Sequence, residues 1–196
     1  MSATSPIVVV LAGPNGAGKS TSAARLLMGA LKVQEFVNAD TIAQGLSAFG
    51  QERVAIEAGR IMLTRLKHLA KIRASFGFET TLAAQTFAPW LKQLRSEGYR
   101  VHLVFLWLPS ADEAVARVAG RVRSGGHSVP ESTIRRRYEA GLRNFSRIYQ
   151  PLADSWQVID NNDIRAPKQV ATGSIQGALV VHEALTWRTI QKKMNS

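Results

Sequence analysis

A glycine-rich stretch near the amino terminus carries the residues best suited to chemistry. Gly13-Pro14-Asn15-Gly16-Ala17-Gly18-Lys19-Ser20 fits the pattern G-x-x-x-x-G-K-[ST], and Thr21 follows it. Glycines in this pattern let successive backbone N–H groups converge on an anion, and the terminus of the following helix adds partial positive charge. We expect Lys19 to reach the outer phosphates of a nucleoside triphosphate and Ser20 to offer its hydroxyl to Mg²⁺. The segment from Gly13 to Thr21 therefore predicts a phosphate loop (P-loop) that binds ATP.

Carboxylates and hydroxyls follow two of the predicted strands. Asp40 comes just after one short strand, and Glu79, Thr80 and Thr81 come at the end of the next. Because ligands gather at the carboxyl ends of strands in open α/β sheets, we expect these side chains to meet. Asp40 is the candidate base for an acceptor hydroxyl; the alternative is a cap for the helix that begins at Thr41. Glu79, Thr80 and Thr81 suit a sugar-like acceptor or a water bound to Mg²⁺, although a capped turn uses the same residue types.

A loop with the composition of a lid lies between two arginine-bearing helices. Gly125-Gly126 forms its hinge, and its cations are Arg121, Arg123 and His127. Closed over ATP, such a lid excludes water and brings guanidinium groups to the γ-phosphate. We therefore interpret these three residues as catalytic.

The net charge of the chain is strongly positive. Its 25 Lys and Arg residues exceed its 14 Asp and Glu residues, which leaves a formal charge of +11. Arginines crowd the stretch from Arg117 to Arg147, and the planar guanidinium suits phosphate because it meets two oxygens at once. Nucleic acid is the alternative partner, but only Tyr138 and Phe145 are interleaved with these arginines and no reader motif occurs. A local anionic ligand is therefore favoured over nucleic acid.

Strand-like and helix-like patterns alternate along the chain. We expect strands at 7–11, 35–38, 75–78, 100–108 and 156–159, and helices at 20–30, 52–73, 87–95 and 177–192, with a further helix beginning at Ser110. This alternation predicts an α/β protein of the P-loop NTPase fold: a parallel five-stranded sheet with helices on both faces and an arginine-rich lid. One domain over residues 1–196 is expected, with 163–196 as a carboxyl-terminal appendage of strand and helix.

Several classes of protein are disfavoured by what the sequence lacks. No N-K-x-D guanine motif occurs, and the predicted strand 100–108 ends without the Asp of a Walker B strand, which disfavours GTPases and transporter ATPases. Without cysteine, disulfide scaffolds and thiolate metal sites are excluded. The apolar runs are far shorter than the ~18 residues of a membrane span and no secretory signal is found, so we expect a cytoplasmic protein. A small ATP- and Mg²⁺-dependent kinase remains, and an ATP-binding switch that contacts nucleic acid is the rival class.

The candidate residues also occur in the order and spacing of a known family. The motifs are Asn15–Thr21 (NGAGKST), Asn38–Asp40 (NAD), Phe78–Leu82 (FETTL), Gly125–Pro130 (GGHSVP) and Asp160–Asn162 (DNN). Over about residues 7–162 the chain resembles the zeta toxin family of bacterial P-loop kinases, in particular its compact branch of predicted ATPases. Characterised toxins of that family phosphorylate a sugar hydroxyl of UDP-N-acetylglucosamine. The resemblance implies that Asp40 is the catalytic base, that Glu79 and Thr81 hold the sugar nucleotide, and that Arg121 lies near the first lid arginine.

Two positions depart from the family pattern. Ala83 stands where the sugar-nucleotide kinases carry a basic residue, and His127 stands at the second lid arginine, which leaves Arg123 or Arg136 to contact the phosphates. The kinase chemistry therefore carries over better than the acceptor, and nucleosides, nucleotides and antibiotics remain alternatives to a sugar nucleotide. A protein of charge +11 with an exposed cleft would also suit an acidic antitoxin polypeptide as its partner.

Overall fold

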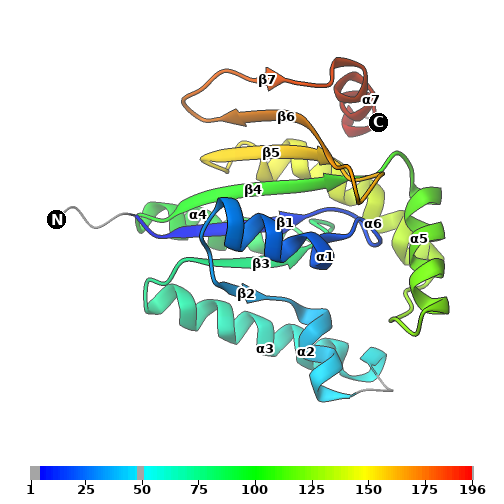
Figure 1. The fold of residues 1–196 in the computed structure, drawn as a ribbon. Coiled ribbons are helices and arrows are strands. Elements are labelled where there is room, and N and C mark those ends of the chain that lie inside the picture. Colours follow the sequence, from blue (N-terminus) through cyan, green and yellow to red (C-terminus); the bar gives the residue numbers. More distant parts are fainter. Residues whose placement is uncertain (1–4, 48–50, 196) are drawn as a thin grey trace.

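The computed structural model describes residues 5–47 and 51–195, so both ends of the expected domain lie outside the described residues. A seven-stranded sheet runs through it in the order β2-β3-β1-β4-β5-β6-β7 (Figure 1). Its strands are β1 (Ile7–Ala12), β2 (Glu35–Val37), β3 (Phe76–Thr80), β4 (Arg100–Trp107), β5 (Ser155–Asp160), β6 (Lys168–Ser174) and β7 (Val180–Val181). The neighbouring pairs from β2 to β5 are parallel, whereas β6 and β7 are added antiparallel.

β1 forms the centre of the sheet because it is apolar on both faces. Val8 to Leu11 are each at most 1% exposed. β3 and β4 flank β1 in parallel register, with Val10 opposite Phe78 on one side and Leu103 on the other. A continuous apolar run of this kind is typical of a strand buried between two helical layers. β1 therefore delivers the P-loop at the carboxyl edge of the sheet.

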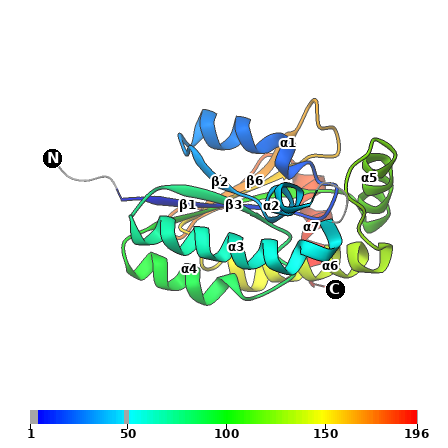
Figure 2. The ribbon, with the colours of Figure 1, turned by 90° about the horizontal axis from the view of Figure 1, so that it is seen from below.

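Helices lie on both faces of the sheet, with α1 on one side and α3, α4 and α6 on the other (Figure 2). Gly77 of β3 leaves room for Leu27 on the first face, and Phe105 of β4 packs on Phe145 on the second, with ring centroids 4.8 Å apart. The helices are α1 (Lys19–Ala24), the π-helix η1 (Arg25–Ala30), α2 (Ala39–Leu46), α3 (Gln51–Lys71), α4 (Phe87–Ser96), α5 (Ala111–Arg123), α6 (Glu131–Asn144), the π-helix η2 (Phe145–Tyr149) and α7 (Ala184–Asn195). The expected α/β architecture of the P-loop NTPase fold is thus confirmed.

The five expected parallel strands are present, but the sheet has seven strands rather than five, because the segment after 162 adds β6 and β7 in antiparallel orientation. In β6 only Val170 and Ala171 are buried, and the remaining residues are polar or small. Such a strand shows no alternation of apolar and polar residues. The last helix begins at Ala184 rather than at 177, because β7 occupies Val180–Val181.

Two smaller differences concern the elements that carry the site. The expected helix over 20–30 divides into α1 and η1, and the N–H of Val33 closes the end of η1 on the carbonyl of Leu27 at 2.9 Å. β3 extends two residues beyond the expected end, because Glu79 and Thr80 pair with Leu11 and Ala12 of β1. Glu79 is thereby fixed beside the start of the P-loop. None of the described helices has the length and apolar character needed to cross a membrane.

Candidate active site

The P-loop has the backbone geometry that its glycines predict. Gly13 and Gly18 adopt positive φ angles of 141° and 76°, a region that side chains other than hydrogen disfavour. A Cβ at Gly13 would collide with the carbonyl oxygen of Leu106, so the close approach of β4 also requires glycine at position 13. The loop then enters α1, which continues into η1.

Lys19 is buried at the centre of the site. Its side chain is 5% exposed, its Nζ donates a hydrogen bond of 2.8 Å to the carbonyl oxygen of Pro14, and the same atom lies 3.5 Å from Oε1 of Glu79. Burial lowers the pKa of Lys19, whereas the charges of Glu79 and Asp40 act in the opposite direction. The ammonium group is thus held in the bend of the P-loop by a carbonyl and a carboxylate.

Ser20, Asn38 and Glu79 bring three elements together. The Ser20 hydroxyl donates to Oε2 of Glu79 at 2.7 Å, and Nδ2 of Asn38 donates to the same oxygen at 2.8 Å and to Oγ of Ser20 at 3.1 Å. Among the described residues, no cluster of three or more His, Asp or Glu side chains that could hold a metal ion occurs. One hydroxyl beside one carboxylate fits Mg²⁺, which keeps several waters and takes phosphate oxygens as its other ligands.

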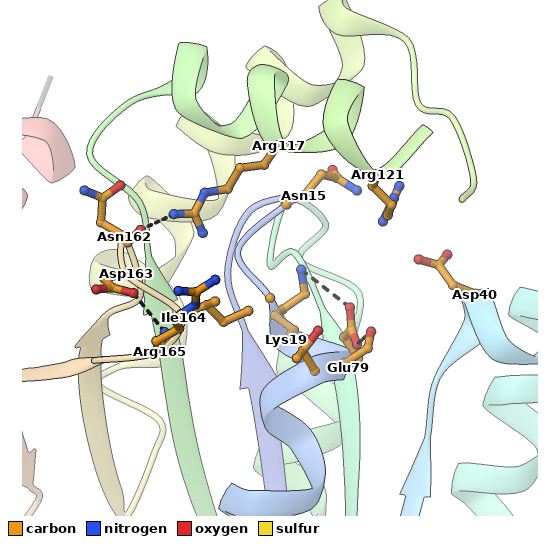
Figure 3. A pocket seen from close by; sticks show the side chains of 14 residues that line it. Asn15, Lys19, Asp40, Glu79, Arg117, Arg121, Asn162, Asp163, Ile164 and Arg165 are labelled. Atoms are coloured by element: carbon orange, nitrogen blue, oxygen red, sulfur yellow. Dashed lines mark hydrogen bonds and ion pairs between the residues drawn. The ribbon is translucent and has the colours of Figure 1, made fainter. Parts of the chain in front are cut away.

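Asp40 faces the same pocket from α2 (Figure 3). Asn38, rather than Asp40, caps α2, because its Oδ1 accepts the backbone N–H of Asp40 at 2.7 Å. The alternative role of Asp40 as a helix cap is therefore wrong. With the cap supplied by Asn38, the carboxylate of Asp40 is left to act in the pocket.

The lid places Arg121 in the pocket and its other candidate cations elsewhere. Arg121 lines the pocket, and its Nε and Nη2 donate to the backbone carbonyl of His127 at 3.1 and 2.6 Å. Gly126 packs against the side chain of Arg121 so closely that a Cβ would lie 2.5 Å from its Cγ. Arg123 and His127 are not among the residues that line the pocket, nor is Arg136. In this arrangement His127 contributes its carbonyl, which orients Arg121.

Arg137 was not predicted as a site residue, and it lies close enough to Asp40 for their charges to interact. Burial lowers the pKa of Arg137, the neighbouring charge of Arg136 lowers it further, and Asp40 opposes them. A carboxylate and a guanidinium thus influence each other across the space between α2 and α6. The adjacent Arg136 gave the only hint in the sequence, since both belong to one run of arginines.

Thr80 and Thr81 cap the turn that follows β3. Their Oγ1 atoms accept the backbone N–H groups of Leu82 at 3.1 Å and Ala83 at 3.4 Å, respectively. Leu82 is buried and has a positive φ of 57°, which is uncommon for a residue with a side chain. The capped turn, which the sequence left as an alternative, is thus present, and neither hydroxyl lines the pocket.

The pocket continues from the P-loop toward residues that the sequence reasoning did not assign. It has a volume of about 520 Å³, and its far end is lined by Arg117 and the loop 162–165. Arg117 donates to the carbonyl oxygens of Asn161 (3.0 Å) and Asn162, and Nδ2 of Asn161 donates to the carbonyl of Ala17 at 2.6 Å. The motif Asp160–Asn162 was the available signal, but nothing in the sequence shows that β5 ends beside the P-loop.

The other arginines of the basic stretch are partly engaged within the protein. Arg135 pairs with Asp112 at 2.7 Å and with Glu131 at 2.8 Å, and Arg117 pairs with Glu113 at 2.7 Å. Arg121 is held by the lid loop. A uniform cationic face for nucleic acid would leave such side chains to solvent, so these contacts support a local role for the stretch.

The fold and the site together define a P-loop nucleotide-binding protein. The sequence model of the AAA domain family matches residues 8–148, and the chain therefore belongs to this family. A relative from Haemophilus influenzae, an uncharacterised protein, is 29% identical over 126 residues, which cover 64% of this chain and 88% of the relative.

Two of the solved structures with the same fold come from systems of two proteins. A chain of the AvrRxo1-ORF1:AvrRxo1-ORF2 complex with ATP superposes with a TM-score of 0.77 at 19% identity; the match covers 99% of this chain but only 66% of the other. A chain of the PezAT toxin-antitoxin system of Streptococcus pneumoniae gives a TM-score of 0.64 at 16% identity, covering 100% of this chain and 88% of that one. The fold expected from the resemblance to the zeta toxins is thereby confirmed.

Proposed function

We propose that this protein is a small-molecule kinase that transfers the γ-phosphoryl group of ATP to a hydroxyl group. The observation that carries the proposal is the convergence of Lys19, Asp40 and Arg121 on one pocket beside the P-loop. A P-loop protein that only binds a nucleotide has no need of a free carboxylate facing the γ-phosphate end of the pocket. A kinase needs one to orient or deprotonate its acceptor.

The chain supplies a group for each part of the transfer. Asp40 takes the proton of the acceptor hydroxyl, whose oxygen forms the new bond to the γ-phosphorus while the bond between this phosphorus and the bridging oxygen of ADP breaks. Lys19 and Arg121 stabilise the charge that spreads over the phosphoryl oxygens. Ser20 and Glu79 would hold Mg²⁺, which when bound neutralises the β- and γ-phosphates. Arg117 and the loop 162–165 would enclose the base of the nucleotide.

A sugar nucleotide similar to UDP-N-acetylglucosamine is the acceptor that the resemblance to the zeta toxins supports. Glu79 and Thr81 would hold it in that family, with Thr80 between them, and Arg136 or Arg123 would contact phosphates after closure of the lid. In the structure Glu79 accepts a hydrogen bond from Ser20, and Thr81 is bonded within its own turn. The acceptor therefore depends on rearrangement of these residues, and nucleosides, nucleotides and antibiotics belong in the same test.

An acidic antitoxin polypeptide is the proposed macromolecular partner. The formal charge of +11 favours such a partner electrostatically. Two of the structures with the same fold come from systems that contain a second protein. A polypeptide laid across the pocket would block Arg121 and Asp40 from ATP and acceptor.

The experiment that tests the kinase is an acceptor screen read by mass spectrometry. The protein is incubated with ATP, Mg²⁺ and one candidate at a time, beginning with UDP-N-acetylglucosamine, and the gain of one phosphoryl group is sought. Lys19→Ala should abolish the product through loss of phosphate binding, and Asp40→Asn should slow its formation by ~10²-fold or more while ATP still binds. ATP consumption that no acceptor increases and that Asp40→Asn leaves unchanged would refute the proposal in favour of an ATP-dependent switch.

A further inference from the structure

A second cavity lies at the edge of the sheet opposite the P-loop. It has a volume of about 540 Å³ and is lined by residues at the amino ends of three parallel strands and at the end of antiparallel β6, including Ile7, Arg100, Ser155 and Ser174. β1 spans Ile7–Ala12 and separates the two edges by roughly 17 Å at ~3.3 Å per residue. The two cavities are therefore distinct: one lies at the carboxyl ends of the parallel strands and the other at their amino ends.

The floor of this cavity is a polar part of the sheet. Trp156 of β5 is buried against Trp187 of α7, with ring centroids 5.8 Å apart. Successive side chains of a strand point to opposite faces, so Ser155 and Gln157 lie on the face away from α7. Both are half-buried, whereas Trp156 and Val158 are buried. This face of β5 is thus accessible and carries polar side chains, which is unusual for a strand in the middle of an α/β sheet.

A chain of hydrogen bonds crosses this face and ends at the cavity. Nε2 of Gln169 donates to Oε1 of Gln157 at 3.1 Å, and the amide nitrogen of Gln157 lies 3.4 Å from Nε2 of His102. Nδ1 of His102 lies 2.6 Å from Oγ of Ser155. Burial lowers the pKa of His102, which favours the neutral imidazole. With Gln157 donating to Nε2, the ring proton is on Nδ1 and is donated to Ser155.

These hydrogen bonds leave the hydroxyl hydrogen of Ser155 free to be donated. Its oxygen already accepts from His102, so its own hydrogen is left for a ligand. A hydroxyl held in this way can donate to an oxygen of a carboxylate or a phosphate. The neighbouring Ser174 and Gln176 line the same cavity and add polar groups.

The charged groups of the cavity leave one guanidinium without an acidic partner. Arg95 pairs with Asp154 at 3.0 Å, and Asp154 is fixed further because it accepts the backbone N–H of Val101 at 2.8 Å. Arg100 is exposed at the start of β4 and makes no ion pair with any described residue. Two guanidiniums against one carboxylate give the cavity a net positive charge.

We propose that this cavity is a second binding site, and that it takes a small organic anion. A carboxylate or phosphate group of the ligand lies between the guanidinium of Arg100 and the hydroxyl of Ser155. An apolar portion of the ligand packs on Ile7, Leu31 and Ile175, which form the apolar part of the cavity wall. Because the P-loop is at the other edge of the sheet, the ligand binds together with a nucleotide and does not compete with it.

The test uses succinate and inorganic phosphate as separate probes and follows backbone amide signals by NMR. Lys19→Ala serves as the parent protein, since it weakens phosphate binding at the P-loop. We expect saturable shifts at Ser155 and Ile175 with at least one of the two probes, and the probe that binds identifies the anionic group of the ligand. Arg100→Ala should weaken this binding about tenfold or more, the usual effect of removing a charged hydrogen bond. Ser155→Ala should weaken it as well.

Arg188→Ala is the matched control for loss of one positive charge, because Arg188 is exposed on α7. It should leave the affinity unchanged. Equal weakening by Arg100→Ala and Arg188→Ala would overturn the proposal, because it would mean non-specific attraction by net charge. Shifts that fail to saturate with both probes, or that are confined to Gly16 and Gly18 of the P-loop, would overturn it too.

Discussion

Asn144 of α6 donates a hydrogen bond of 2.7 Å to the carbonyl oxygen of Leu82, the residue with positive φ in the turn after β3. The same amide nitrogen reaches the carbonyl of Ala83 at 3.2 Å. The hydroxyl of Tyr149 donates to Ala84 at 2.7 Å, and Gly141 of α6 packs directly on the backbone of Thr81. The helix that follows the lid loop is thus bonded to the turn that follows Glu79, so the lid and the carboxyl edge of the sheet are positioned by one element.

Replacing Asn144 should destabilise this turn. Asn144 is 8% exposed, so Asn144→Ala leaves the buried carbonyl of Leu82 and the partly buried carbonyl of Ala83 without this donor and should cost roughly 1–3 kcal/mol in the free energy of unfolding. Asn144→Asp keeps the shape of the side chain but cannot donate when ionised, and we expect a similar loss. Chemical denaturation measures both variants. A wild-type free energy of unfolding for Asn144→Asp would show that the two bonds contribute nothing.

Asp40→Asn should separate catalysis from nucleotide binding. Among the described residues, the side chain of Asp40 makes no hydrogen bond or ion pair with the P-loop, so the affinity for ATP should stay near that of the wild type. Phosphoryl transfer should fall by ~10²-fold or more through loss of the base. Calorimetry measures the affinity, and the rate of ADP formation with the identified acceptor measures the transfer. A parallel loss of ATP affinity would instead assign Asp40 to the metal.

Arg121→Ala should act on the rate of transfer. A guanidinium that stabilises the transferring phosphoryl group is worth most in the transition state, so we expect kcat to fall by ~10²–10³-fold with little change in KM for ATP. Arg147 is exposed on η2, in the same basic stretch, and Arg147→Ala is the matched control. If both variants lower kcat equally little and both weaken binding to nucleic acid, the lid interpretation is wrong.

His102 should make the stability depend on acid pH. Burial lowers the pKa of His102 in the folded protein below its ordinary 6.5, so the unfolded chain binds the extra proton more readily. The stabilising contribution is complete above about pH 6.5 and is lost as the pH falls through the lower folded pKa. His102→Gln should therefore lose less stability than the wild type between pH 7.5 and 5, as measured by urea denaturation at each pH. His182→Gln, at an exposed histidine, is the control; identical slopes for all three proteins would exclude this role.

The sequence was most informative where one short segment determines its own geometry. The P-loop follows from its glycines, Lys19 and Ser20 alone, and the strand before it follows from a continuous apolar run. The position of Asp40 at the pocket was also predictable, because a strand end locates it without knowledge of distant contacts. The roles of Asn38 as helix cap and of the His127 carbonyl as anchor for Arg121 were not, since each depends on which of several polar atoms points inward.

Long-range placement explains the remaining misses. Arg117 and the loop 162–165 are joined only because β5 lies beside β4, 44 residues separating Arg117 from its bonded partner Asn161. The bounds of β6 were not predicted, because only Val170 and Ala171 are buried in it and a strand that is polar at both ends resembles a loop. The periodicity of a sequence indicates which face of a helix or strand is buried. The contacts of Arg117 and the pairing of β6 depend instead on which elements become neighbours in the fold.

The bonds of Glu79 to Ser20 and Lys19 give the pocket a preference between two forms of the same nucleotide. Glu79 places a negative charge where the β- and γ-phosphates of a P-loop ligand arrive. It repels a bare triphosphate, and it attracts one that carries a divalent cation. Nucleotide and cation should therefore bind with positive cooperativity, each raising the affinity for the other by the same factor. Glu79→Gln would remove this repulsion, so the pocket should bind free ATP almost as tightly as ATP that carries a divalent cation.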